Sequence, residues 1–91
     1  MSEVQHNPSQ QRYEATVGGH LSVCEYERAG GAMIFTHTVV PPELRGQGIA
    51  EKLVRAALAD ARAAGHRVVP RCTYVAKFIE RHQEFQDLLA E

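Results

Sequence analysis

The spacing of hydrophobic residues changes once along this 91-residue chain, at the segment that covers residues 41–48. Before that segment, apolar and polar residues roughly alternate over residues 13–17 and 21–26, and residues 32–40 are rich in β-branched and aromatic side chains. Both patterns are typical of strands. After it, residues 49–64 repeat apolar side chains at helical spacing and include seven alanines, which predicts an amphipathic helix. The chain is therefore expected to have an α/β fold.

Glycines mark the connections between these elements. Gly18 and Gly19 can take the positive φ angles of a type I′ turn, and residues 29–31 make a second turn. Gly65 is expected to end the helix, after which residues 66–71 form a short strand and residues 73–82 a second helix. The predicted topology is an antiparallel three-stranded meander, then a right-handed strand-helix-strand unit and a C-terminal helix.

The length fits one domain of ordinary globular composition. Residues 1–11 are mostly polar and lack periodicity, so they are expected to be a mobile arm or a poorly paired edge. Residues 12–91 are then the single folded domain.

Charge and cysteine content exclude several classes of partner. Ten Lys and Arg against eleven Asp and Glu leave too little positive charge for a nucleic acid partner. No apolar run approaches the roughly 20 residues that cross a bilayer. Cys24 and Cys72 fit neither a disulfide framework nor a metal-ligand spacing, and the histidines lack such a spacing too. We expect no metal, Cys24 packed in the core, and a cytoplasmic protein without a secretion signal.

The loop before the long helix carries the clearest binding signal. It reads Pro41-Pro42-Glu43-Leu44-Arg45-Gly46-Gln47-Gly48-Ile49-Ala50. Its glycines let backbone N–H groups remain exposed at a helix N-terminus, where the helix dipole also favours an anion, and Arg45 adds a full positive charge. The loop lacks the third glycine of a dinucleotide fingerprint and the Gly-Lys-Ser/Thr of a P-loop. It is therefore expected to bind a phosphate or pyrophosphate in another way.

The spacing Arg45-x-x-Gly48-x-Ala50 resembles the acetyl-CoA pyrophosphate signature of the GCN5-related N-acetyltransferases. The stretch from Thr36-His37-Thr38 through the loop to Val68-Val69-Pro70-Arg71-Cys72 resembles the minimal single-domain branch of that superfamily, over roughly residues 12–86. The resemblance implies a truncated acetyltransferase fold, acetyl-CoA as cosubstrate, and a primary amine as acceptor, either a protein lysine or a small amine. It also implies CoA contacts from Arg45, Gly46, Gln47, Gly48, Ile49 and Ala50.

In that superfamily the pantetheine arm of CoA lies between two parallel strands like an added strand. The matching positions here are Val39 and Val40, whose backbone groups would bond the arm. Pro70 supports such a gap, because it lacks an N–H and would interrupt a central ladder. Residues near Pro70 are therefore expected not to pair with the third strand, so that the two strands splay.

His37 and Cys72 are the candidate catalytic residues, expected on opposite sides of this splay near the thioester. The resemblance implies that His37 takes a proton from the amine. Cys72, next to the N-terminus of the second helix, either shapes the site or is a nucleophile that His37 activates and acetyl-CoA acetylates. The superfamily mostly uses direct attack, so direct transfer is the favoured alternative.

Two positions depart from the family pattern. Val39 stands where the minimal branch commonly has an acidic residue, so a carboxylate base is missing. Glu80 aligns with the tyrosine that acts as the acid in larger members, and Tyr74 is out of register. The rival interpretations are a non-catalytic acyl-CoA-binding module and a small interaction domain that uses its helix as a partner surface. Three cations are candidates for the CoA 3′-phosphate: Lys52, Lys77 and Arg81.

Overall fold

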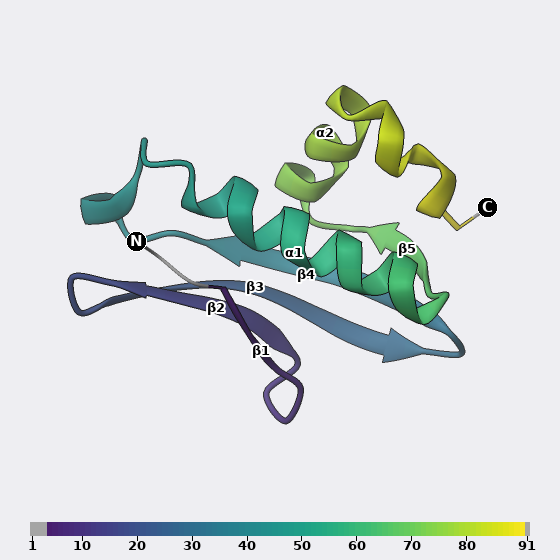
Figure 1. The fold of residues 1–91 in the computed structure, drawn as a ribbon, viewed down its shortest axis with the longest axis horizontal. Helices are drawn as coiled ribbons and strands as arrows, with labels where there is room; N and C mark the ends of the chain where they lie inside the picture. The colour runs from purple at the N-terminus through teal and green to yellow at the C-terminus, as the bar shows by residue number, and fades with distance from the viewer. Residues whose placement is uncertain (1–3, 91) are drawn as a thin grey trace.

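The computed structural model describes residues 4–90 and arranges them as one twisted sheet with helices packed against it (Figure 1). In chain order the elements are β1 (Gln5–Asn7), β2 (Arg12–Val17), β3 (His20–Ala29), β4 (Ala32–Val39), the 3₁₀ turn η1 (Pro42–Leu44), α1 (Ile49–Ala64), β5 (Arg67–Pro70), α2 (Thr73–Arg81) and the 3₁₀ segment η2 (Gln83–Leu88). The sheet order is β1-β2-β3-β4-β5, antiparallel except for the parallel pair β4–β5. The predicted meander, strand-helix-strand order and C-terminal helix are confirmed.

Both predicted turns between the antiparallel strands are present, and each contains two glycines with positive φ. The β2–β3 turn has φ of +57° at Gly18 and +78° at Gly19, and the β3–β4 turn has +53° at Gly30 and +84° at Gly31. Side chains with a Cβ rarely adopt this region, so the glycines permit the tight connections that hold β2, β3 and β4 in register.

Helix α1 has the bounds that its apolar stripe predicted, and it covers one face of the sheet. Leu53, Val54 and Leu58 have no exposed surface, and each such side chain contributes about 1.5–3 kcal/mol on burial. Gly65 ends the helix with φ of +75°, and its N–H bonds the carbonyls of the last turn. The core beneath α1 consists mainly of inward side chains of the sheet, among them Tyr13, Ala15, Cys24, Tyr26, Met33, Phe35 and Val68.

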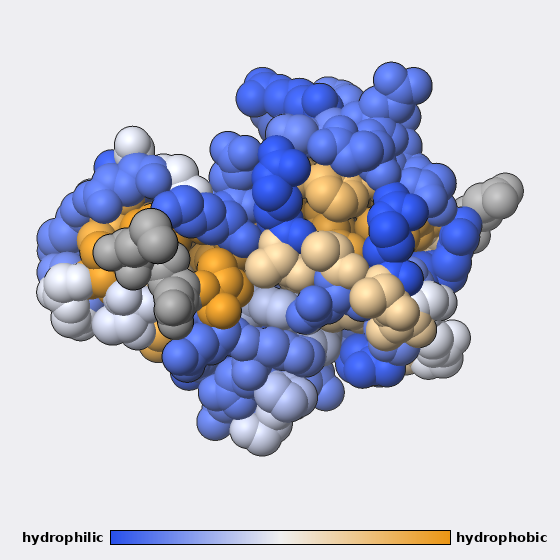
Figure 2. Space-filling view, viewed as in Figure 1, coloured by the Kyte–Doolittle hydropathy of each residue, from blue (hydrophilic) through white to orange (hydrophobic). Residues whose placement is uncertain are grey.

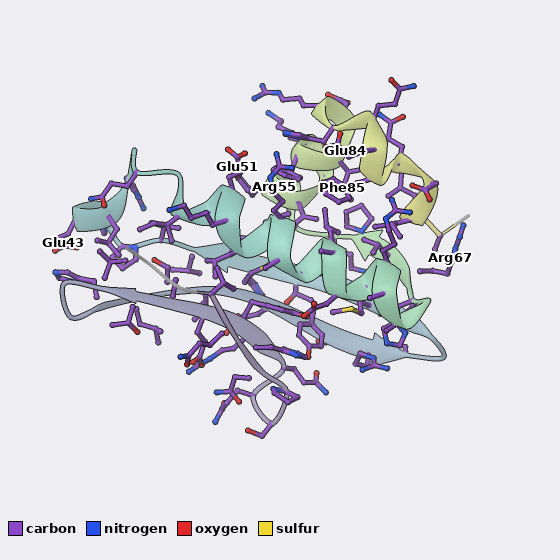
Figure 3. The ribbon with its side chains drawn as sticks, viewed as in Figure 1. Glu43, Glu51, Arg55, Arg67, Glu84 and Phe85 are labelled. Atoms are coloured by element: carbon purple, nitrogen blue, oxygen red, sulfur yellow. The ribbon has the colours of Figure 1, made fainter. Side chains whose placement is uncertain are left out.

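Arg55 joins α1 to the C-terminal segment. Its guanidinium lies 3.1 Å from a Glu51 carboxylate oxygen and 3.6 Å from one of Glu84, and 5.9 Å from the centre of the Phe85 ring (Figure 3). Phe85 and Leu88 are buried, so the residues after α2 belong to the core. The chain then reaches the free edge of β5, where the Ala90 N–H donates to the Val68 carbonyl at 2.9 Å.

The N-terminal segment differs in part from the predicted mobile arm. Residues 1–3 lie outside the described residues, but Gln5–Asn7 form β1, a short antiparallel edge strand on β2. His6 stacks on Tyr13 with ring centres 4.3 Å apart and shares a hydrogen bond with the Tyr26 hydroxyl. These residues therefore form a short edge strand rather than a mobile arm. His6 contacts two tyrosines, and the periodicity of the sequence does not reveal these contacts.

The surface is mostly polar, with two apolar areas in the view of Figure 2. Pale apolar atoms cross the middle of the molecule over α1, whose exposed positions include Ala59, Ala63 and Ala64. Stronger apolar colour lies at the end of the molecule where β4 ends and the loop to α1 begins (Figures 1 and 2). Within residues 4–90, no helix is both long and apolar enough to span a membrane.

Candidate functional site

The two halves of β4 have different neighbours on the β5 side. Ala32–Phe35 pair with residues 67–70 of β5, and the Cys72 N–H donates to the Phe35 carbonyl at 2.8 Å. The parallel register ends there, so residues 36–39 have no β5 partner. The expectation that residues near Pro70 do not pair with the third strand is wrong, because residues 68–70 are in register with residues 33–35. The two strands separate only after Pro70. Its missing N–H costs no bond there, because Cys72 supplies the donor to Phe35.

A groove of about 430 Å³ lies at the splayed end of β4. Its walls come from the end of the strand, the following loop, the first turn of α1 and the first turn of α2. Four of the eight residues expected to contact CoA lie together here. The lining residues are Thr38, Val39, Val40, Arg45, Ala50 and Tyr74.

The loop holds its shape through one buried anchor and its own backbone. Leu44 is 4% exposed and fixes η1 to the core, and the Arg45 Nε donates to the Val40 carbonyl at 3.3 Å. Gly46 and Gly48 have φ of +84° and +75°, a region that a β-branched residue rarely adopts.

The first turn of α1 presents its backbone to the groove without a side-chain cap. Gly48 is the N-cap residue and makes no side-chain hydrogen bond to the turn, so the first amides remain available to an anion. Ile49 contributes backbone only, because its side chain is buried in the core. Gln47 bonds the Glu43 carbonyl at 3.5 Å. The expected anion site is thus a backbone site with Arg45 beside it.

A β-bulge decides which way His37 points. Glu25 of β3 pairs with His37, but the next residue, Tyr26, pairs with Phe35, so Thr36 is an extra residue in β4. Phe35 is therefore buried under α1, whereas the His37 side chain is 69% exposed and faces away from the helix. Its Nδ1 lies 3.5 Å from a Glu25 carboxylate oxygen.

Cys72 lies on the helix side of the sheet, where its polar neighbour is Thr38. The Thr38 hydroxyl is 3.5 Å from the Cys72 sulfur and 3.8 Å from that of Cys24. Since consecutive residues of a strand point to opposite faces, His37 and Thr38 face opposite ways. The structure therefore corrects the idea that His37 activates Cys72: the two flank the splay from different faces and share no contact.

Cys24 is a core residue, as predicted. It is fully buried, and burial raises the pKa of its thiol to about 12, although the hydrogen bond with Thr38 acts in the opposite direction. Both cysteines are free thiols.

Tyr74 is the site residue that sequence reasoning set aside. It lies on the first turn of α2, lines the groove with Val39 and Arg45, and is 39% exposed. Partial burial, followed by the negative charge of Glu51, raises the pKa of its hydroxyl. Glu80, the position aligned with the family tyrosine, is an exposed residue near the end of α2. In the sequence Tyr74 is out of register with the family tyrosine, so only the placement of α2 reveals it as a lining residue.

Two of the three candidate cations lie next to this groove. Lys77 and Arg81 line a smaller pocket of about 190 Å³ that shares Tyr74 with it. A separate concavity of about 390 Å³ lies at the other end of α1, but its tyrosines are already bonded within the protein: the Tyr13 hydroxyl donates to Asp60 at 2.7 Å.

The structure is thus an α/β domain in which an uncapped helix N-terminus lies beside the point where a parallel strand pair ends. The family model of the GCN5-related N-acetyltransferases matches residues 12–88, and the chain belongs to that family. The fold is similar to the NMR solution structure of a GCN5-like protein from Staphylococcus aureus, with a TM-score of 0.77 and 22% sequence identity. That similarity covers 97% of this chain and 87% of the other.

Proposed function

We propose that this protein transfers an acetyl group from acetyl-CoA to a primary amine. The observation that carries the proposal is the open edge of β4 over residues 36–39, directly beside the uncapped N-terminus of α1 and Arg45. One element offers backbone groups to an extended arm, and the other offers amides and a charge to a pyrophosphate. The family to which the chain belongs supports the same chemistry.

Each part of CoA then has a place in the groove. The pyrophosphate lies over the backbone of Gly46, Gln47, Gly48, Ile49 and Ala50, with Arg45 as its counter-charge. The pantetheine arm follows the β4 edge at Val39 and Val40, whose backbone N–H groups polarise the thioester carbonyl. Lys77 and Arg81, which line the neighbouring pocket that shares Tyr74 with the groove, are the cations we propose for the 3′-phosphate.

The proposed reaction is direct transfer in a ternary complex. The amine nitrogen attacks the thioester carbonyl carbon, a C–N bond forms and the C–S bond breaks. The proton of the amine passes to His37, and the CoA sulfur leaves with the electron pair and is then protonated. Tyr74, whose hydroxyl has a pKa raised by partial burial, is the donor we propose for that sulfur.

An acetyl-cysteine route through Cys72 is the rival mechanism, and the contact of its thiol with Thr38 rather than with a base argues against it. We expect no covalent adduct when the protein is incubated with acetyl-CoA alone and analysed by intact-protein mass spectrometry. The Cys72→Ala variant should keep the rate of the wild type. A one-acetyl adduct on Cys72 that an amine then discharges would overturn direct transfer.

The alternative function is a non-catalytic acyl-CoA-binding module. An amine-acceptor screen with detection of thiol release separates the two functions, because a binding module retains CoA affinity in calorimetry but releases no thiol with any amine. Both cysteines are free thiols, which fits the cytoplasmic location expected from the sequence.

A further inference from the structure

We propose that Glu25 is a positioning residue for His37 and that the acceptor amine reaches the thioester from the sheet face opposite α1. The inference rests on the proposed function, since it assigns a role within the same reaction. It also supplies a carboxylate beside His37 from another strand. The minimal branch commonly has a carboxylate at position 39, where this chain has a valine.

The bulge at Thr36 brings Glu25 and His37 together. The two residues are directly opposite in the β3–β4 register, on the face that α1 does not cover. The extra residue in β4 separates this outward pair from the buried pair of Tyr26 and Phe35. The Thr36 hydroxyl donates to the Glu25 carbonyl at 3.3 Å, which ties the bulge to the strand that carries the carboxylate.

The Glu25 carboxylate selects the useful form of the imidazole. It lies 3.5 Å from His37 Nδ1, and in our proposal it holds the hydrogen of the neutral imidazole on that nitrogen. Nε2 then has a free electron pair with which to accept the proton of the attacking amine. A carboxylate that orients a histidine base in this way need not belong to the same strand, and here it comes from the neighbouring one.

The space beside His37 is open to an acceptor. A groove of about 440 Å³ lies on this face, with polar walls from β3, β4 and the β1–β2 turn. On the other face, the Thr38 hydroxyl contacts the thiols of Cys24 and Cys72. Because CoA fills the groove beside Thr38 and Tyr74 in the proposed complex, the space left for the amine is on the His37 face. The lining residues are Ser9, Gln10, Gln11, Glu25, Tyr26, Glu27, Thr36 and His37.

The test variant is Glu25→Gln, and Glu25→Asp is the conservative variant that keeps a carboxylate. The control is Glu84→Gln, which removes the carboxylate that pairs with Arg55 on the surface. Thiol-release kinetics should give a kcat for Glu25→Gln lower by about 10-fold to 100-fold, the range typical of partners that orient a histidine, with an unchanged KM for acetyl-CoA. Glu25→Asp should recover part of the rate, and Glu84→Gln should match the wild type.

Imidazole ¹⁵N shifts of His37 provide the readout that a merely structural role would not move. We expect the Nδ1–H tautomer in the wild type and a shift towards the Nε2–H tautomer in Glu25→Gln. A kcat within twofold of the wild type, or a lower kcat with an unchanged tautomer, would overturn the role of Glu25 and leave the proposed function standing. Absence of turnover in the wild-type chain with every amine would instead defeat the proposed function, and this inference with it.

Discussion

The two halves of β4 show how one strand can serve stability at one end and binding at the other. Residues 32–35 have partners on both edges, and Met33 and Phe35 are buried beneath α1. Residues 37–39 pair with β3 on one edge, residues 36–39 have no β5 partner on the other, and Val39 is 52% exposed. The paired half saturates its backbone hydrogen bonds within the sheet. The open half leaves donors and acceptors that only a ligand or water can satisfy.

The change between the halves occurs within three residues and has two causes. The β3 side contributes the bulge at Thr36, which reverses the direction of the side chains that follow. The β5 side contributes the end of the register at Pro70, after which the chain turns into α2 at Thr73. Because both changes coincide, the open edge, the outward His37 and the N-terminus of α2 all lie at the same end of β4.

The largest effect is expected for the free energy of unfolding, when a residue of the paired half of β4 is changed. Phe35→Ala removes a side chain with no exposed surface from the centre of the core, and substitutions of this kind cost about 3–5 kcal/mol of unfolding free energy. Urea denaturation followed by circular dichroism measures it. Val39→Ala in the open half is the matched comparison and should change stability by less than about 0.5 kcal/mol. Similar losses for both variants would contradict the division of β4.

The second-largest effect is expected on the affinity for CoA, and it concerns the loop between β4 and α1. Gly48→Val places a branched side chain where the pyrophosphate approaches the first amides of α1, and we expect CoA affinity in calorimetry to fall by about 100-fold, which is about 2.7 kcal/mol. An added Cβ at Gly48 meets no atom within 4 Å, so the fold has room for it and strain arises only from the positive φ.

Gly30→Val is the control for that strain. Gly30 also has a positive φ and no atom within 4 Å of an added Cβ, but it lies in the turn at the other end of β4. Both variants should lose comparable stability, and only Gly48→Val should lose CoA. Equal CoA affinity in the two variants would remove the loop from the binding site.

The sequence predicted the elements whose signals are local. The stripe from Ile49 to Ala61 and the glycine at position 65 defined α1, and the paired glycines defined both turns. The loop motif placed Arg45 and Ala50 in the groove, because a strand, a turn and a helix N-terminus in succession allow few geometries.

The features that sequence did not predict depend on partners distant in the chain. Period-two alternation does not reveal an extra residue, so the bulge at Thr36, and with it the separation of His37 from Cys72, became visible only in the register with β3. Glu25 and His37 are twelve positions apart in a hairpin whose register the bulge sets. Tyr74 reaches the groove through the angle between α2 and the sheet, which no residue spacing encodes.

The smallest effect is expected at Tyr74, the residue that connects the open half of β4 to α2. Tyr74→Phe removes only the hydroxyl that we propose as the proton donor to the leaving sulfur. Burial raises the pKa of this hydroxyl above its ordinary value of 10, so the group stays protonated through the neutral range and loses its proton only at still higher pH. We expect kcat at neutral pH to fall by about tenfold, since water can replace part of the donor's role, while CoA affinity stays within twofold.

Cys72→Ala serves as the comparison for Tyr74→Phe, since Cys72 lies two residues earlier and contacts Thr38 on the helix side of the same strand. If Tyr74 is the acid, its loss should lower kcat without changing the KM for acetyl-CoA, and the wild type should lose activity above pH 10 in a way that Tyr74→Phe does not. If Tyr74 only forms a wall of the groove, its ring is enough, and the phenylalanine variant should retain the wild-type kcat across the same pH range. A wild-type kcat in Tyr74→Phe would leave the open half of β4 as the binding edge, but solvent would then be the donor of the proton to the leaving sulfur.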